Sequence, residues 1–373
     1  MFAAPRVGSV GTLLQIIYIL HEKSSVCYVM MSKIFQNEYG IYISHKLYLD
    51  SIYDNVNGES YSVRESLFNI CNPYKIEKVH KENHINDDHL QKEHENVRRK
   101  FHLFISDREI VNLFLKEVTN SKNNNNHTAL KTADLIYEES GKHKVENAFG
   151  ANTGPAVKKM VNLSIYLFPE NSTFYAKDVR HIHEHLQSNY FDFILLDPPW
   201  WNKYIRRKRK KSNDAYNMMF NLDLKNIPIE NIMKPNGLVA VWCTNSEQNF
   251  NYLVNIIFPK WNIQYIGKWY WMKITNQGKP VCPFSEPPGK QPYEKIVFGC
   301  TERSQPNPKD GQLVVSVPSA IHSHKPPLIE IMQDFLPANP VCLEIFARYL
   351  LPGWTSYGNE VLRLQHESMF SNS

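Results

Sequence analysis

The sequence predicts a three-layer α/β domain over residues 156–373, preceded by a smaller mixed α+β domain. After Pro155 the chain changes to short apolar runs that are bounded by turn residues and alternate with helical patterns. This alternation is typical of a sheet with helices on its faces. Hydrophobic residues make up 42% of the 373 residues and charged residues 21%, so the chain can bury a sizeable core.

The strands of the second part are predicted from runs that are almost continuously apolar, as buried central strands are. These runs lie at 173–176, 191–196, 237–243, 265–273, 295–300, 313–317 and 342–346. Apolar residues at helical spacing predict helices at 181–188, 224–233, 246–257 and 327–335. Ligands of such sheets bind beyond the carboxyl ends of the strands, so we expect the site among the residues that follow each strand.

The first 155 residues are predicted to comprise a tail and an accessory domain. Residues 1–30 contain a short apolar stretch with no small-residue cleavage site after it, and we interpret them as a poorly ordered tail. In the accessory domain, 31–155, the alternation in 32–49 favours short strands or a hairpin, and the spacing in 96–118 predicts one or two helices. The polar run at 121–127 predicts a linker.

Charge, cysteine spacing and histidine context narrow the class of protein. The 42 Lys+Arg and 37 Asp+Glu residues leave a mildly basic net charge of +5. The apolar stretch at 13–20 is shorter than the roughly 20 residues that cross a bilayer, so no membrane is expected. The six cysteines include no CxxC pair, which fits a reducing compartment. The histidines at 80–94 and 181–185 lack the framing of a metal site, so no metal is expected.

The motif Asp197-Pro198-Pro199-Trp200 directly follows the predicted strand at 191–196. Two consecutive prolines fix φ and keep the preceding residues extended, which leaves backbone carbonyls as acceptors. A carboxylate, a free carbonyl and an indole face suit a planar heteroaromatic ring with an exocyclic amino group. Asp197 and the Pro198 carbonyl would accept its N–H groups, Trp200 would stack on the ring, and the nitrogen lone pair would be directed at an electrophile. The alternative is a plain turn that ends a strand.

This motif resembles the catalytic signature of the adenine-N6 methyltransferases that use S-adenosylmethionine. Further resemblances follow in order at 197–203, 241–245, 323–327 and 344–360, so the likeness covers roughly residues 162–364. It implies a Rossmann-like methyltransferase domain with a parallel sheet flanked by helices. The topology should be the permuted form, because the catalytic motif precedes the cofactor strand that ends near Glu344. The implied catalytic residues are Asp197, Pro198, Pro199 and Trp200.

The resemblance also implies that S-adenosyl-L-methionine is the cofactor. Lys325 matches the family's lysine that reaches the methionine carboxylate, and Asn359-Glu360 matches its adenosine-contacting pair. The complete implied cofactor set is Asp178, Val179, Asp197, Lys325, Glu344, Phe346, Arg348, Asn359 and Glu360. The chain departs from many relatives at Ala347, where they have glycine, and it has no glycine-rich loop.

The basic run at 206–211 predicts contacts with a nucleic-acid backbone, because neutralising phosphates gives affinity that does not depend on sequence. The same run is a candidate nuclear-localisation signal, and the remaining alternative is a solvated loop. A second loop, at 286–294, should border the pocket. The predicted substrate-binding residues are Trp200, Trp201, Asn202, Lys203, Arg206, Arg207, Lys208, Arg209, Lys210, Lys211, Glu286 and Lys290.

The family resemblance implies N6-methylation of adenosine in RNA, with small nuclear RNA favoured and 2′-O-methyladenosine as a target form. The alternatives are N6-adenine methylation of DNA, a non-catalytic nucleic-acid-binding scaffold, and methylation of a small-molecule or protein amine. Scaffold members lose the carboxylate or the aromatic residue of the motif, whereas Asp197 and Trp200 are both present here. We therefore predict an active enzyme, nuclear or shared with the cytoplasm, without an obligatory protein partner and sufficient as a monomer.

Overall fold

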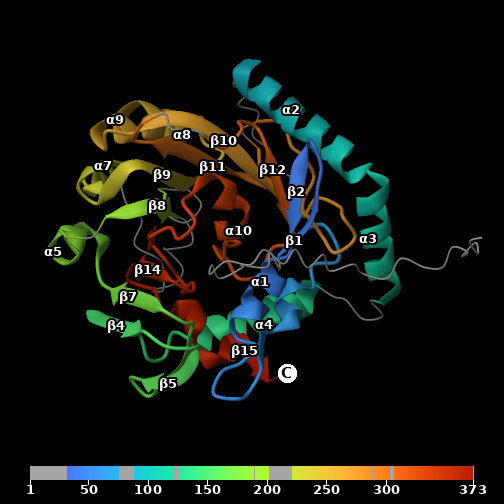
Figure 1. Cartoon of the computed structure of the whole chain (residues 1–373). Coiled ribbons are helices and arrows are strands. Elements are labelled where there is room, and N and C mark those ends of the chain that lie inside the picture. Colours follow the sequence, from blue (N-terminus) through green and yellow to red (C-terminus); the bar gives the residue numbers. More distant parts are fainter. Residues whose placement is uncertain are drawn as a thin grey trace, which may run out of the picture. The chain divides into compact units, whose positions relative to one another are not determined.

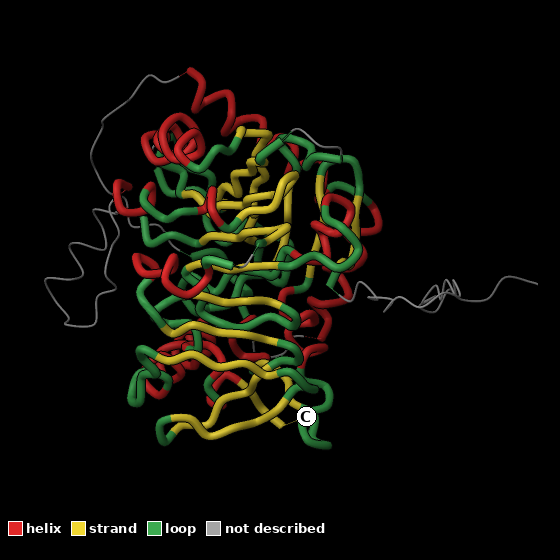
Figure 2. The backbone as a smooth tube through the Cα atoms, turned by 60° about the vertical axis from the view of Figure 1, so that its left-hand side comes forward, coloured by secondary structure: helices red, strands yellow, loops and turns green. Residues whose placement is uncertain are grey.

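An 11-stranded mixed sheet forms the centre of the protein, in the order β1-β2-β12-β10-β11-β9-β8-β13-β14-β7-β4 (Figure 1). The computed structural model describes residues 32–74, 88–120, 126–188, 190–200, 221–287, 289–302 and 306–372. In the backbone trace of Figure 2, which is turned by 60° from the view of Figure 1, the strands lie one above another. Two small two-stranded sheets, β15-β3 and β5-β6, complete the β-structure of these residues.

The strands of the second part begin and end close to the predicted positions, which confirms the α/β class. The strands of the main sheet are β1 Lys33–Gln36, β2 Gly40–Ile43, β4 Ala148–Asn152, β7 Ser172–Ala176, β8 Phe191–Leu196, β9 Met233–Cys243, β10 Gln264–Lys273, β11 Tyr293–Cys300, β12 Leu313–Ser316, β13 Cys342–Ile345 and β14 Trp354–Tyr357. The strands of the small sheets are β3 Tyr61–Val63, β5 Val157–Val161, β6 Ser164–Phe168 and β15 Phe370–Asn372.

A parallel group, β9-β8-β13-β14-β7, makes up the part of the sheet that carries the predicted site. β13 lies between β8 and β14 in the sheet, although β8 (Phe191–Leu196) comes much earlier in the chain than β13 (Cys342–Ile345). The catalytic strand thus comes before the predicted cofactor strand, which is the permuted order that the resemblance implied. The antiparallel strands β11 and β4 border this group on its two sides.

Helices cover both faces of the sheet. They are α1 His45–Ile52, α2 Asp88–Ile105, α3 Arg108–Asn120, α4 Asn126–Glu139, α5 Ile182–Leu186, α7 Asn221–Lys225, α8 Glu247–Tyr252, α9 Phe258–Lys260 and α10 Ile329–Met332. Buried side chains of α1, α4 and α10 pack on one face. Those of α5, α7 and α9 pack on the other over β8 and β9, and α2 and α3 continue this second layer over β10 and β12. Figure 1 shows the sheet curving around α1 and α10.

The structure corrects the predicted domain boundary between residues 155 and 156. Residues 32–372 belong to one compact unit, because β1 and β2 extend the main sheet through β12 instead of forming a separate domain. Gly40 makes this junction possible, since a Cβ atom there would lie 2.8 Å from the Cβ of Leu313. The predicted tail at 1–30 lies outside the described residues.

Several predicted elements differ from the observed ones for local reasons. The expected helix at 224–233 is only α7 and a short 3-10 turn, because Pro228 interrupts it and Met233 already begins β9. The segment 32–49 forms the predicted hairpin, but α1 starts at His45, where the Ser44 side chain accepts the Leu47 N–H at 3.2 Å and caps the helix. Helix α4 and the strands β3, β4, β5, β6, β14 and β15 were not predicted.

Candidate active site

The residues predicted to form the site converge on one edge of the sheet. Asp178 follows β7, Asp197 follows β8, Glu344 lies near the end of β13 and Asn359 follows β14. These strands are neighbours and parallel, so their carboxyl ends meet at the same edge. Residues separated by more than 160 positions in the chain are thereby brought into one row.

The catalytic motif leaves β8 as a rigid turn whose acceptors are partly engaged. The Trp200 backbone N–H donates to the Pro198 carbonyl at 2.8 Å, so one of the two acceptor positions of that carbonyl is occupied. The Trp200 indole N–H donates to the Trp242 carbonyl at 2.7 Å, and the side chain is 7% exposed. The expectation of an entirely free Pro198 carbonyl is therefore wrong, and most of the indole is packed into the protein.

Asp197 belongs to a group of four charged side chains, which we call the site cluster: Asp197, Lys273, Glu294 and Lys325. Lys325 Nζ lies 3.5 Å from Asp197 Oδ1 and 2.5 Å from Glu294 Oε2. Lys273 forms an ion pair with the other oxygen of Glu294. Cation–π contacts extend the cluster, since Lys325 Nζ is 5.2 Å from the Trp242 ring.

The four charges shift one another's pKa values. Burial raises the pKa of Asp197, with a smaller opposing effect of Lys325 and a further rise from Glu294. Burial alone would lower the pKa of Lys325, but Asp197 and Glu294 raise it above its ordinary value. Burial would likewise raise the pKa of Glu294, but Lys273 and Lys325 hold it far below its ordinary range. Lys325 is thus a stable ammonium, and Asp197 is the more easily protonated of the two carboxylates in the site cluster.

Sequence reasoning missed Glu294 and Lys273. Within the predicted loop it selected Glu286 and Lys290, both of which are exposed. Glu294 lies instead in β11, where Glu294 and Lys295 are the two charged residues of an otherwise largely apolar strand. A carboxylate in such a strand is the signal that could have identified it, because a buried charge needs a partner.

Glu344 is the most strongly buried acid at this edge, with 4% of its surface exposed. Burial, followed by repulsion from Asp197, raises its pKa to about 8. Its Oε2 atom has no hydrogen-bond partner among the residues that the structure describes. A buried acceptor without a partner is costly, so this oxygen is available for a hydroxyl or amine donor of a ligand.

Asp178 is already engaged. Its carboxylate caps the 3-10 helix Val179–His181 by accepting the Arg180 N–H at 3.0 Å, and it also pairs with the Arg180 guanidinium at 2.5 Å. Val179 is buried in the core. The backbone carbonyl of Asp178 is engaged as well, because it accepts the His181 N–H at 3.0 Å and the Tyr357 hydroxyl at 3.2 Å.

The remaining predicted cofactor residues lie in the two loops after β13 and β14. Arg348 pairs with Glu360 at 3.0 Å and thus links the loops. Phe346 adopts φ +67, a strained conformation of the kind found at functional sites. A Cβ at Gly358 would lie 3.1 Å from the Ala347 carbonyl oxygen, so glycine at 358 allows the loops after β13 and β14 to approach closely.

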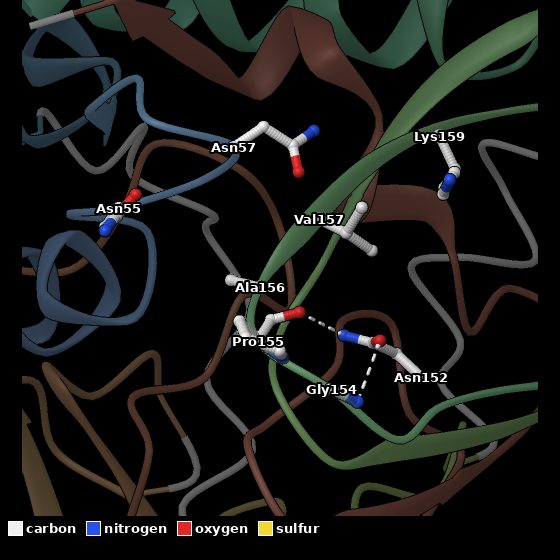
Figure 3. Close-up of a pocket in the computed structure, with 8 residues that line it drawn as sticks. All are labelled: Asn55, Asn57, Asn152, Gly154, Pro155, Ala156, Val157 and Lys159. Atoms are coloured by element: carbon white, nitrogen blue, oxygen red, sulfur yellow. Dashed lines mark hydrogen bonds between the residues drawn. The ribbon is translucent and has the colours of Figure 1, made fainter.

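The basic run and its neighbours, Trp201, Asn202, Lys203 and 206–211, lie outside the described residues. Among the residues that are described, no three His, Cys, Asp or Glu side chains converge as metal ligands would. A hollow of about 480 Å³ is lined by Asn57, Asn152 and Lys159 (Figure 3). The hollow lies near the amino end of β7, because Asn152 pairs with Ser172 at the start of that strand. The predicted site residues follow the carboxyl ends of the strands, and none of them lines the hollow.

The donor and acceptor set fits S-adenosylmethionine in part. Lys325 offers an ammonium to a carboxylate, and the unpaired Glu344 oxygen offers an acceptor to hydroxyl groups. Asn359 is exposed at the same edge. The Asp178 carboxylate does not fit as a direct ligand, because Arg180 occupies it.

Comparison with known proteins shows which family this part of the chain resembles. Residues 191–360 match the model of the MT-A70 family. Over this stretch the chain is similar to the MT-A70 family, and the sheet flanked by helices is of the α/β class. The match includes Asp197, Glu294, Lys325 and Glu344, but not the N-terminal strands or helices.

Individual relatives are similar over the same region. The chain is 37% identical over 219 residues to the human protein named N(6)-adenine-specific methyltransferase METTL4, which covers 55% of this chain and 45% of the relative. It is 34% identical over 212 residues to the DNA N6-methyl methyltransferase of Caenorhabditis elegans, covering 56% of each chain. It is 36% identical over 187 residues to the N6-methyladenosine RNA methyltransferase MTA1 of Cryphonectria parasitica, covering 49% of this chain and 55% of the relative.

The chain spans about half the length of these curated relatives. In the described part of the chain, no helix has both the length and the apolar character that a membrane crossing requires.

Proposed function

We propose that this protein transfers a methyl group from S-adenosylmethionine to the N6 atom of an adenine in nucleic acid. The observation that carries the proposal is the position of Asp197, which follows β8 at the open edge of the region similar to the MT-A70 family, 3.5 Å from the Lys325 ammonium. The names of the three relatives cited above all refer to N6 methylation: of adenine in the human protein, of DNA in the Caenorhabditis elegans protein and of adenosine in RNA in the Cryphonectria parasitica protein.

Asp197 would bind the target amine as an acceptor. Its carboxylate and the remaining acceptor position of the Pro198 carbonyl would draw the two N–H groups out of the ring plane, which frees the nitrogen lone pair for attack. Lys325 supports this role, because it opposes the rise in the pKa of Asp197 and so favours the ionised carboxylate. The proton of the methylated amine can then leave by way of Asp197 to solvent.

The cofactor would lie along the same edge. When bound, S-adenosylmethionine supplies the electrophilic methyl group. Lys325 would hold its carboxylate, and Glu344, Asn359 and the Arg348–Glu360 pair would bind its adenosine part. The hydrogen bond from the Trp200 indole N–H to the Trp242 carbonyl holds the indole in place, and the indole would lie beside the target base.

For the substrate, we favour RNA, with small nuclear RNA and 2′-O-methyladenosine as the finer proposal from the family resemblance. The basic run at 206–211, close to the motif in sequence, supports a nucleic-acid substrate and also a nuclear location. The relatives' names divide between DNA and RNA, so N6-methylation of DNA is the competing substrate. An unpaired or flipped adenine is required in either case.

The test is transfer of labelled methyl groups to RNA and DNA oligonucleotides, some with 2′-O-methyladenosine, followed by nucleoside mass analysis. The wild type should form N6-methyladenine, and Asp197→Asn should reduce kcat by about 10²–10³-fold while cofactor binding persists. Cofactor binding without any product would point to a missing partner or to another amine substrate. No cofactor binding would favour the scaffold alternative.

A further inference from the structure

The segment that carries Lys325 into the site is a short strap between β12 and α10 with few backbone restraints. Ser323 has φ +61, and the His324 N–H donates to the Ile321 carbonyl at 3.3 Å. The Tyr349 hydroxyl donates to the Lys325 carbonyl at 3.0 Å. The strap has no regular secondary structure around Lys325, so side-chain packing has to define where the ammonium points.

His324 is the buried anchor of this strap, with 2% of its surface exposed. Its ring lies edge-on to Tyr349, with the centroids 5.3 Å apart. Because Tyr349 also holds the Lys325 carbonyl, any movement of the His324 ring would be transmitted to Lys325 from two sides.

The other side of the His324 ring is covered by a residue of the N-terminal region. His45, the first residue of α1, is 1% exposed, and its ring centroid is 4.3 Å from that of His324 at an interplanar angle of 70°. Phe68 in turn lies edge-on to His45 at 5.3 Å. Neither ring nitrogen of His45 has a hydrogen-bond partner within the described ranges, so the contact is one of ring packing.

We propose that His45 is a positioning residue that holds His324, and through it Lys325, in the geometry needed at the site. The MT-A70 match begins at residue 191, so the site of this protein would be completed by a residue from outside the matched domain. The proposal rests on the proposed function in one respect, the role of Lys325 as the residue that binds the cofactor carboxylate. Burial lowers the pKa of both histidines, which agrees with a neutral, packed pair.

The test compares His45→Ala with Ile110→Ala in the full chain. Ile110 lies in α3, is fully buried, and belongs to a cluster that contains neither His324 nor Lys325. Both changes remove a buried side chain and lower the melting temperature. The dissociation constant for S-adenosylhomocysteine, KM and kcat, and hydrogen exchange of the 321–326 segment are measured for each.

We expect His45→Ala to weaken cofactor binding and to raise KM for the cofactor about tenfold, by analogy with the loss of residues that orient metal ligands without touching the metal. It should also speed exchange in 321–326, whereas Ile110→Ala should leave both within about twofold of the wild type. Equal effects of the two variants, or unchanged exchange in His45→Ala, would overturn the proposal. If the wild type binds no cofactor, the proposed function fails, but the exchange comparison still decides the role of His45.

Discussion

Two buried charge clusters lie on opposite faces of β11. Each contains two lysines and two carboxylates, but the two clusters have different roles. The helix cluster comprises Glu93, Glu247, Lys268 and Lys295, and the site cluster was defined above. In each, one glutamate joins two lysines and a second carboxylate lies 3.5–3.8 Å from one of them. Glu294 and Lys295 are consecutive in β11 and therefore point to opposite faces.

The two clusters differ in how completely they are enclosed. In the helix cluster, Lys295 is 1% exposed and the Tyr270 hydroxyl adds a hydrogen bond of 2.6 Å to Glu93. Burial alone would raise the pKa of Glu93, but Lys295 and Lys268 lower it to about 2. In the site cluster, two lysines likewise lower the pKa of Glu294, but burial raises the pKa of Asp197 more than Lys325 lowers it. The helix cluster ties α2 to the sheet through Glu93. The site cluster keeps, at a strand end, a carboxylate whose negative charge is only partly compensated by Lys325.

Lys325→Ala should have the largest effect, because it removes the cation that Asp197 and Glu294 share. We expect kcat/KM for methyl transfer to fall by about 10²–10³-fold. The acid limb of the pH–rate profile should move to higher pH, since Lys325 lowers the pKa of Asp197. Lys268→Ala is the matched control from the helix cluster, and its activity should stay within about threefold of the wild type below its melting temperature. A similar loss of activity in both variants would remove the distinction between the clusters.

Glu93→Ala should be the most destabilising change in the helix cluster. It leaves two buried lysines without their carboxylate, and breaking a buried ion pair costs about 3–5 kcal/mol of unfolding free energy. The pKa of Glu93 is depressed to about 2, so its contribution is present above the ordinary value of about 4.5 and is lost as the pH falls toward 2. Denaturant unfolding from pH 7 to pH 3 measures this, and a wild-type advantage that persists unchanged at low pH would contradict the ion-pair account.

Glu344→Gln should reveal the cost of burying an acid without a partner. The pKa of Glu344 is raised to about 8, so the folded wild type holds a proton that the unfolded chain releases above about pH 4.5. The stability of the wild type relative to Glu344→Gln should therefore fall by up to about 1.4 kcal/mol per pH unit between pH 5 and pH 8. Thermal unfolding of both proteins across this range tests the expectation, and a constant difference would mean that Glu344 is ionised throughout.

Glu294→Gln should have the smallest effect on methyl transfer. It should shift the acid limb of the pH–rate profile in the direction opposite to the shift caused by Lys325→Ala. Glu294 raises the pKa of Asp197 by repulsion, so its neutralisation should move the acid limb of the pH–rate profile to lower pH. The hydrogen bond to Lys325 can be kept by the amide oxygen. If the acid limb moves to higher pH or does not move, the group that titrates in the profile is not Asp197.

Prediction from sequence succeeded where a local pattern carries the information. The apolar runs located β7 to β13, and the position of Asp197-Pro198-Pro199-Trp200 after β8 placed the motif at a strand end. It failed for β14, whose short run Trp354–Tyr357 mixes polar and aromatic residues, and for the domain boundary, which depends on β2 pairing with β12. Strand pairing between distant segments has no local signature.

The roles of the site residues remain predictions, but their surroundings were decided by tertiary contacts. The sequence marked Lys325 and Glu344 through resemblance, and it contained no sign that Glu294 would be the closer partner of Lys325, 31 positions away. Nor did it indicate that Arg180 would occupy the Asp178 carboxylate or that one acceptor position of the Pro198 carbonyl would be taken.

By itself, the sequence determined the α/β class and the strand-end position of the catalytic motif. These follow from periodicity and from turn chemistry, which act over a few neighbouring residues. Only the tertiary structure decided which charges share a cluster, which carboxylate is buried without a partner, and that His45 lies against His324. Those properties depend on burial and on distances between segments far apart in the chain, and the pKa values and contacts of a side chain follow from them.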